Sequence, residues 1–186
     1  GSRFLAALDD EPDSSQAVLD AGEIFTETTI RFLRAQLACL REPLGIVVLD
    51  DTVGTLTAGA FARFAAPALR RIFKTFDGLV RIFRCDTPCR PVLPQLPDLG
   101  FEVFHFSHRM DIREVRDALG SRIALMGNVS PVEILARGVP EQVESAGREC
   151  VVRAGKSSGL ILSAAGTVLS GTPSENIDAL VRAARH

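Results

Sequence analysis

The chain has 186 residues, of which 46% are hydrophobic and 24% are charged, a composition typical of a globular domain and not of a disordered chain. Its formal net charge of −2, from 21 basic and 23 acidic residues, gives no general attraction to nucleic acid or to an anionic membrane. The apolar runs are far shorter than the roughly 20 residues that cross a bilayer, and no signal-peptide pattern is present. We therefore expect a cytoplasmic protein with no nucleic-acid or membrane partner.

The first elements of the chain alternate between helical and strand patterns. Residues 12–40 carry apolar side chains at helical spacing, which predicts one long helix. Residues 45–51, GIVVLDD, form a continuous apolar run that ends in two aspartates and predicts a buried strand. Residues 57–76 are helical by period, although Pro67 is expected to kink or interrupt this helix.

The same strand–helix unit then repeats to the end of the chain. Four more apolar runs, at 79–86, 101–108, 122–129 and 159–166, are followed by a Pro-rich connector with a short helix or by helical segments at 111–120, 130–138, 140–155 and 172–186. The last helix has Thr172 as N-cap, Pro173 in its first turn and Glu175 three residues after the cap, which predicts a capping box. Unbroken apolar strands that alternate with helices predict an α/β fold with a parallel sheet, as a single domain over residues 1–186.

Polar or small residues follow each predicted strand. Parallel α/β proteins place their chemistry at the carboxyl ends of strands, where the loops converge. Paired carboxylates can supply a general base, and a histidine can transfer protons. We expect catalytic roles for Asp50, Asp51 and His108, and substrate contacts for Cys85, Asp86, Ser107, Asn128 and Ser163.

Each of these residues also has a structural interpretation. Asp50 or Asp51 could cap the helix or loop that follows, and Asn128 could have a turn role. Lone histidines are more often hydrogen-bonded structural groups; of His105 and His108, the second lies nearer the carboxyl end of its strand. The basic face at residues 63–74 is interpreted as solvated surface, with docking of an acidic partner protein as the alternative.

Two cysteines lie four residues apart after the second strand. Cys85 and Cys89, with Cys39 and Cys150, are too few and too scattered for a disulfide framework, so reduced thiols are expected. One Cys-x3-Cys pair without a second pair is weak evidence for a metal site. No glycine-rich phosphate loop of the usual nucleotide-binding kinds follows any strand.

Three stretches carry a resemblance to a known family. These are VLDD with AFARFAAPALRRIF, ALMGNVSPVEILARGVPEQVE, and LILSAAGTVLSGTPSENIDALVRAAR. They resemble the carboxyl-terminal half of the uroporphyrinogen decarboxylase superfamily, which includes the cobalamin (corrinoid) methyltransferases. The most specific parts are residues 127–131 and 171–176, and residues 138–141 are more typical of the methyltransferase branch. The resemblance implies that the chain forms the last five βα units of a (βα)8 TIM barrel.

A closed barrel of this kind takes about 250 residues, and unpaired strand edges invite association. We therefore expect either that the chain is a fragment, or that a separate amino-terminal half-barrel or a second copy of the chain closes the barrel.

The resemblance also bears on metal binding. The zinc-dependent branch has a His-x-Cys pair on the strand that corresponds to residues 79–86, and a further cysteine at the end of the last strand. The resemblance places Phe83 at the histidine position, Cys85 at the first cysteine position, and Gly166 or a neighbour at the second. Because Cys85 is the only retained ligand-type residue, no metal is expected and zinc is not predicted as a cofactor.

Three functions remain open on the sequence alone. The first is methyl transfer from a small methylated substrate, with a corrinoid (cobalamin) carried by a partner protein. The second is decarboxylation of uroporphyrinogen. Against it, the resemblance implies a Gly-His-Gly motif at the end of the last strand of decarboxylases, where this chain has Ala164, Ala165 and Gly166. The third is a non-catalytic barrel half that serves as an assembly or binding module. The methyltransferase branch is the prediction, because of GNVSP and the loop that follows it.

Overall fold

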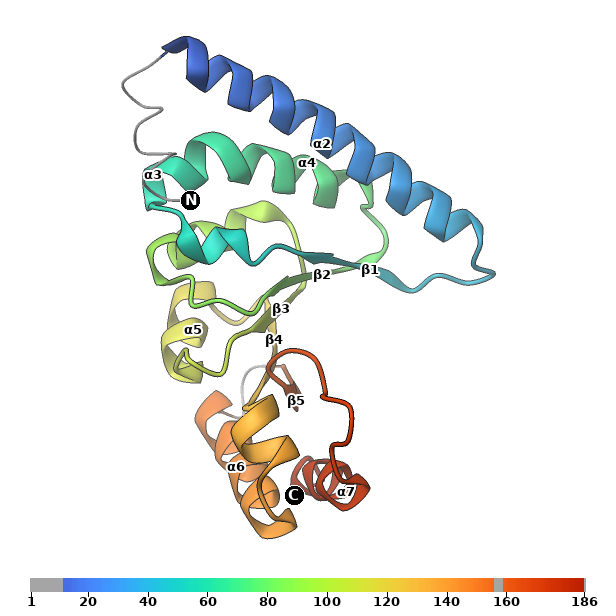
Figure 1. The fold of residues 1–186 in the computed structure, drawn as a ribbon, viewed down its shortest axis with the longest axis vertical. Helices are drawn as coiled ribbons and strands as arrows, with labels where there is room; N and C mark the ends of the chain where they lie inside the picture. The colour runs from blue at the N-terminus through green and yellow to red at the C-terminus, as the bar shows by residue number, and fades with distance from the viewer. Residues whose placement is uncertain (1–11, 156–158, 186) are drawn as a thin grey trace. The chain divides into compact units, whose positions relative to one another are not determined.

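The computed structural model describes residues 12–155 and 159–185 of the chain. Five strands alternate with helices in chain order, so the predicted α/β class is confirmed (Figure 1). These residues form two compact units. The first unit runs to Phe83 and includes Cys89–Glu102, and the second consists of Arg84–Pro88 and the chain from Val103 onward.

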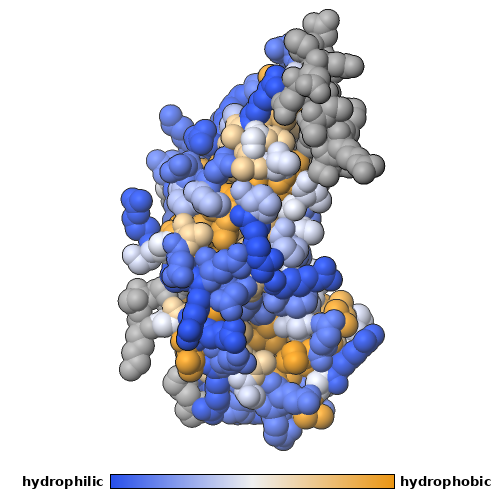
Figure 2. Space-filling model, turned by 90° about the vertical axis from the view of Figure 1, so that its left-hand side faces the viewer, coloured by the Kyte–Doolittle hydropathy of each residue, from blue (hydrophilic) through white to orange (hydrophobic). Residues whose placement is uncertain are grey.

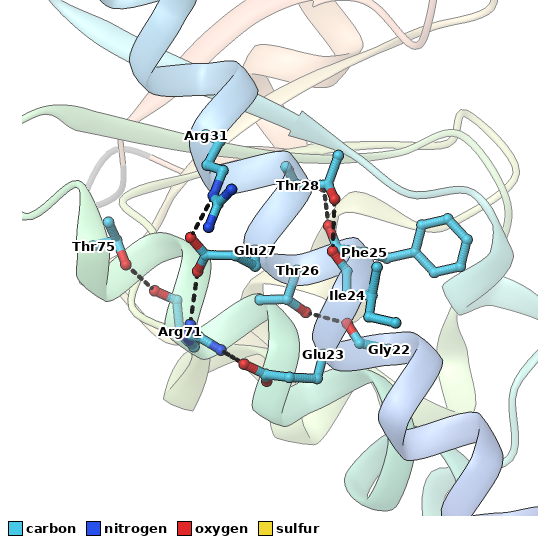
Figure 3. Close-up of polar contacts among 11 residues, drawn as sticks. Gly22, Glu23, Ile24, Phe25, Thr26, Glu27, Thr28, Arg31, Arg71 and Thr75 are labelled. Atoms are coloured by element: carbon cyan, nitrogen blue, oxygen red, sulfur yellow. Dashed lines mark hydrogen bonds and ion pairs between the residues drawn. The ribbon is translucent and has the colours of Figure 1, made fainter.

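A long helix dominates the first unit. This helix, α2 (Pro12–Ala38), agrees with the predicted helix and packs against α4 (Ala66–Thr75). Arg71 of α4 forms ion pairs with Glu23 and Glu27 of α2, and its Nη2 lies 3.0 Å from Glu27 Oε2 (Figure 3). Phe25 extends from the side of α2 away from Arg71 and is 72% exposed. The long helix is therefore packed along one side only in the described part of the chain.

The predicted helix at residues 57–76 is interrupted, as Pro67 led us to expect. The chain passes through a short helix, α3 (Ala58–Ala60), and a π-helical turn, η3 (Phe61–Ala65), before α4 begins with Pro67 in its first turn. Proline is tolerated there because the first amides of a helix have no intrahelical acceptor.

The first unit contains β1 (Gly45–Leu49) and the part of β2 (Val80–Cys85) that ends at Phe83, and the two strands are neighbours in the sheet. Side chains of β1 alternate: Ile46 is buried, whereas Val47 and Leu49 are more than half exposed. Only one face of this strand is therefore covered by the residues described. A 3₁₀ turn, η2 (Thr52–Thr55), follows β1, and the predicted Pro-rich connector after β2 is the 3₁₀ segment η4 (Arg90–Leu99).

The core of the first unit contains an aromatic cluster. Phe73 of α4, Phe83 of β2 and Phe101 have ring centroids 5.5–6.1 Å apart. Phe73 and Phe83 are fully buried, and aromatic pairs at this spacing add about 0.5–1.5 kcal/mol beyond their buried area. The face of β2 that carries Phe83 therefore points into the core.

Three parallel strands form the centre of the second unit. They are β3 (Val103–Phe106), β4 (Ala124–Val129) and β5 (Leu160–Ala164), in that order in the sheet. β3 pairs with β4 in parallel from Val103 and Ala124 onward, and β4 pairs with β5 so that Asn128 lies beside Ser163. Their carboxyl ends therefore share one edge of the sheet, as the sequence predicted.

The helices of the second unit follow the predicted order. They are α5 (Ile112–Leu119), the π-helical turn η5 (Pro131–Ala136), α6 (Pro140–Ala154) and α7 (Ser174–Ala183). Asp111 caps α5 by accepting hydrogen bonds from the amides of Arg113 and Glu114, at 2.8 and 3.3 Å. Apolar side chains of η5, α6, β5 and α7 form one buried cluster: Leu135, Val143, Ala164 and Ala179.

One predicted helix cap is wrong. α7 begins at Ser174 with Pro173 at the cap position, and the Thr172 hydroxyl donates a hydrogen bond to the Leu169 carbonyl at 2.8 Å. Thr172 therefore stabilises the preceding loop and not the helix. Asn176 in the first turn of α7 donates instead to the carbonyls of Leu135 and Gly138, at 2.9 and 2.8 Å.

The surface carries apolar side chains among hydrophilic ones, and hydrophobic patches are visible in Figure 2. Among the large apolar residues of the first unit, those with the largest exposed fractions are Leu44, Phe25, Ile24, Phe32 and Leu40. Within the described ranges, no helix combines the length and the apolar character needed to span a membrane.

Candidate functional site

A polar cluster lies at the carboxyl ends of strands in the second unit, and we call it the strand-end cluster: Arg84, Asp86, His105, Gly166 and Thr167. Arg84 binds Asp86 with two hydrogen bonds, from Nε to Oδ1 at 3.1 Å and from Nη2 to Oδ2 at 2.6 Å. Nη2 also donates to the Thr167 hydroxyl at 3.2 Å. The Arg84 side chain is 19% exposed, and such bidentate pairs hold the planar guanidinium in a fixed orientation.

Gly166 brings the loop after β5 against this ion pair. Its φ of +118° is a conformation that side-chain-bearing residues rarely adopt. A Cβ at this position would lie 3.2 Å from Asp86 Oδ2 and 3.7 Å from Arg84 Nη2. The glycine is therefore required both by the backbone and by the closeness of the ion pair.

His105 of β3 joins the cluster through its Nε2 atom. Nε2 lies 2.8 Å from the Ala164 carbonyl oxygen, and the Gly166 amide donates to it at 3.2 Å. One nitrogen cannot donate to the first and accept from the second at the same time, so the two contacts belong to alternative tautomers. Burial lowers the pKa of His105 and the Arg84 charge lowers it further, while the Ala164 carbonyl acts in the opposite direction. The imidazole is therefore neutral at neutral pH.

Cys85 lies beside the cluster in sequence but points elsewhere. Successive side chains of a strand point to opposite faces, so Cys85 shares its face with Phe83 and not with Arg84. The Cys85 thiol is fully buried and donates to the Thr87 carbonyl at 3.3 Å. Cys89 is also fully buried, in the first unit, where its carbonyl accepts from the amides of Val92 and Leu93. None of the four cysteines, all within the described ranges, forms a disulfide.

A second polar group surrounds Asn128 at the end of β4, and we call it the Asn128 cluster: Asn128, Ser107, Met110 and Cys150. The Asn128 amide donates to the carbonyls of Ser107 and Met110, at 3.4 and 3.0 Å. The Cys150 thiol of α6 donates to Asn128 Oδ1 at 3.6 Å. Burial raises the pKa of this thiol, which therefore stays protonated at neutral pH. These contacts join β4 to the loop after β3 and to α6.

A cavity of about 230 Å³ lies next to the Asn128 cluster. Its wall includes His108 and Asn128, two residues that the sequence analysis proposed for the site, and Glu149, Cys150 and Arg153 of α6. His108 thus lies in the wall of this cavity, whereas His105 takes part in the strand-end cluster.

The two serines among the predicted contact residues make local hydrogen bonds. Ser107 is buried, and its hydroxyl accepts from the Arg109 amide at 3.3 Å. The Ser163 hydroxyl donates to the Ala164 carbonyl at 3.0 Å. The Ala164 carbonyl therefore has a donor even when His105 Nε2 carries no proton.

The predicted aspartate pair lies in the first unit, at the end of β1. Asp50 Oδ1 accepts hydrogen bonds from both the amide and the hydroxyl of Thr52, with 2.9 Å to the amide nitrogen. This is the loop-capping role that the sequence left open for one of these residues. Catalytic roles for Asp50 and Asp51 stay predictions.

The zinc set of the related branch does not fit this chain. Among the described residues, no three His, Cys, Asp or Glu side chains are grouped so that they could hold a metal ion. Cys85 points into the core, Gly166 has no side chain, and the Arg84–Asp86 pair lies against Gly166. The positively charged group at this strand end is the guanidinium of Arg84.

Sequence reasoning did not select Arg84, His105, Gly166 or Thr167 as site residues. The available signal was Arg84 itself, a charged residue on the strand VRIFRC whose neighbours Phe83 and Cys85 face the core. Alternation along the strand places Arg84 on the opposite face, which is the face that the strand-end cluster uses.

Comparisons with known proteins agree with the fold. The family model described as uroporphyrinogen decarboxylase (URO-D) matches residues 1–186. A methylated-thiol–coenzyme M methyltransferase of Methanosarcina mazei is 25% identical over 94% of this chain and 45% of that protein. Uroporphyrinogen decarboxylases of Synechococcus and Coxiella burnetii are 28% and 27% identical over 94% and 97% of the chain, and over 48% and 50% of those proteins.

A solved structure, a methyltransferase from Methanosarcina mazei, superposes with a TM-score of 0.79 at 22% identity, over 93% of this chain and 52% of that one. The likeness shows the same fold. The chain spans about half the length of the curated relatives it matches. Because the family model covers every residue of the sequence, the chain belongs to the uroporphyrinogen decarboxylase (URO-D) family.

Proposed function

We propose that this chain is part of an enzyme that moves a methyl group from a small methylated substrate to a corrinoid carried by a partner protein. The observation that carries the proposal is the charge balance of the strand-end cluster, where the guanidinium of Arg84 is matched by the carboxylate of Asp86. A porphyrinogen with several carboxylates calls for a group of cations. In the described part of the chain this cluster offers one cation, already paired with a carboxylate, which supports a small substrate.

The residues of this chain would position the substrate. The exposed Thr167 hydroxyl and the Arg84 guanidinium offer hydrogen bonds to a polar group of the methyl donor. His105, neutral because burial lowers its pKa, adds no second charge. A corrinoid, when bound, supplies the nucleophile that accepts the methyl group. The contribution of the protein is orientation and exclusion of water.

The active enzyme needs more chain than is present here, since the relatives are about twice as long. Val47 and Leu49 of β1 are 55% and 53% exposed, as expected of strand side chains that another part of a barrel would cover. We infer that an amino-terminal half, or a second copy of this chain, covers them.

Uroporphyrinogen decarboxylation is the second candidate function. It is favoured by the decarboxylase relatives, one of which is 28% identical over 182 residues. A non-catalytic assembly role is the third candidate, and it has no specific contact in its support.

The test is a pair of assays on the full-length protein. In the first, cob(I)alamin is the acceptor, and methanol, methylamines, methoxylated aromatics and methylthiols are the donors. Formation of methylcobalamin is followed by absorbance. In the second, uroporphyrinogen is the substrate, and loss of its carboxyl groups is followed by chromatography. Methyl transfer without decarboxylation supports the proposal, whereas decarboxylation without methyl transfer contradicts it.

A further inference from the structure

We propose that the strand-end cluster binds one oxygen anion of the substrate through Arg84. This inference rests on the proposed function for the location of the substrate, and it narrows the substrate class to small molecules that carry a carboxylate or a phenolate oxygen.

Arg84 is held ready for such a contact. The two hydrogen bonds to Asp86, at 3.1 and 2.6 Å, use Nε and Nη2 and fix the plane of the guanidinium. A second hydrogen bond from Nη2 goes to the hydroxyl of Thr167, an exposed residue. A substrate oxygen that replaces the Thr167 hydroxyl would meet an oriented donor, so little ordering would be needed on binding. Asp86 is thus a positioning residue.

The Gly166 amide can become a second donor while the Ala164 carbonyl keeps a hydrogen-bond partner. In one tautomer His105 Nε2 accepts from this amide, at 3.2 Å. In the other, Nε2–H donates to the Ala164 carbonyl at 2.8 Å, and the Gly166 amide is released to another acceptor. Ser163 donates to the same carbonyl at 3.0 Å, so Ala164 keeps a partner in both tautomers. When His105 takes the second tautomer, the Gly166 amide can therefore donate to a bound anion.

The absence of a side chain at Gly166 lets the loop after β5 lie close to the Arg84–Asp86 pair. A Cβ would lie within 3.2 Å of Asp86 Oδ2 and 3.7 Å of Arg84 Nη2. The amide of Gly166 and the guanidinium of Arg84 are therefore close enough to contact the same small group.

The charge balance sets the kind of anion. The Arg84–Asp86 pair has no net charge, so a polyanion gains little long-range attraction from this site. A single oxygen anion gains short, directional hydrogen bonds from a guanidinium, which matches carboxylate and similar oxygens in geometry. The site is thus suited to one anionic oxygen and gives no support to a metal-bound thiolate.

The test measures binding to the full-length protein by calorimetry, without a corrinoid. Two matched pairs of probes differ mainly in the charge on oxygen: benzoate against benzamide, and 4-nitrophenolate against 4-nitroanisole at about pH 8. A charge-assisted hydrogen bond predicts that the anion of at least one pair binds about tenfold more tightly than its neutral partner. Preference within the first pair identifies a carboxylate site, and preference within the second identifies a phenolate site.

Variants test whether Arg84 is the residue that causes the preference for the anion. Arg84→Gln is expected to abolish the preference for the anion, and Arg84→Lys to keep part of it. The matched control is Arg153→Gln, because Arg153 of the same unit also pairs with a carboxylate, Asp111 at 2.7 Å, but lies outside the cluster. This control should keep the full preference. Circular dichroism shows whether each variant is folded, and Arg84→Lys carries the test if Arg84→Gln is not.

Equal binding of anion and neutral partner in both pairs, or the same preference in Arg84→Gln as in the unchanged protein, overturns the inference. Failure of methyl transfer with this preference intact counts against the proposed function alone, since the binding experiment contains no methyl acceptor.

Discussion

The strand-end cluster and the Asn128 cluster lie at the ends of neighbouring strands in the same unit, yet their polar groups have different partners. Asn128 donates to two main-chain carbonyls and accepts from Cys150, so its hydrogen bonds join β4 to the loop after β3 and to a helix. Arg84 has side-chain partners, Asp86 and Thr167, and Thr167 is exposed. Partners on the main chain indicate a structural role, whereas exposed side-chain partners can be exchanged for a ligand.

A strand end is therefore not enough to identify a functional residue. Both clusters satisfy the rule that chemistry in parallel α/β folds lies at carboxyl ends of strands. The two clusters differ in what the protein loses when a polar side chain is removed. In the Asn128 cluster it loses a structural contact, and in the strand-end cluster it loses a contact with the substrate. Three substitutions or conditions separate these roles.

The largest effect is expected at Gly166. Gly166→Ala should lower the free energy of unfolding by about 2 kcal/mol, because a Cβ is strained at a φ of +118° and also meets the Arg84–Asp86 pair. Gly171→Ala is the matched control, since Gly171 has a φ of +81° but nothing within 4 Å of the added Cβ. Urea denaturation measures both.

The two glycine variants should differ by about 1 kcal/mol, which is the cost of displacing the ion pair. Equal destabilisation of Gly166→Ala and Gly171→Ala would show that the closeness of the pair to Gly166 has no energetic consequence.

A loss of stability is also expected at Asn128, without a loss of substrate binding. Asn128→Ala leaves the carbonyls of Ser107 and Met110 without this donor, which should cost about 1–2 kcal/mol in denaturant unfolding. Cys150→Ala removes only the weak thiol donor to Asn128 and should cost less. If Asn128→Ala kept its stability but lost affinity for small substrates, Asn128 would belong to the binding site and the distinction between the clusters would fail.

The smallest effect is expected from pH and concerns His105. In the folded protein, burial lowers the pKa of His105 below its ordinary value of 6.5. As the pH falls below about 6.5, the unfolded chain therefore binds more protons than the folded protein, and the folded state loses stability. Each unit of lowering is worth about 1.4 kcal/mol. Unfolding measured from about pH 8 to about pH 5 should show this loss, and His105→Asn should reduce it. An unchanged pH profile in that variant would assign the loss to other groups.

The sequence predicted the fold well because burial and periodicity are local signals. The five strands and the long helix α2 lie where apolar periodicity placed them, and Pro67 interrupts its helix as expected. Helix starts were harder to predict: Thr172, the predicted cap of α7, binds Leu169 because Pro173 takes the cap position.

The site was harder to predict because it depends on side-chain direction and on contacts distant in sequence. Cys85 was selected as a retained ligand-type residue, but its face of β2 is the core face. Arg84 donates a hydrogen bond to Thr167, which lies 83 residues away in the sequence, and the pattern of the strand does not predict this contact. The close approach of Gly166 to this pair has no signature in the sequence around it.

The most direct test of the account compares methyl transfer to cob(I)alamin by the full-length protein and by its Arg84→Gln and Asn128→Ala variants, once an active donor has been found. With donor below saturation, the account predicts that a folded Arg84→Gln variant loses about tenfold or more in rate, as the loss of a charge-assisted contact implies. Asn128→Ala should stay within about twofold despite its lower stability. An active Arg84→Gln variant beside an inactive but folded Asn128→Ala variant would contradict the account.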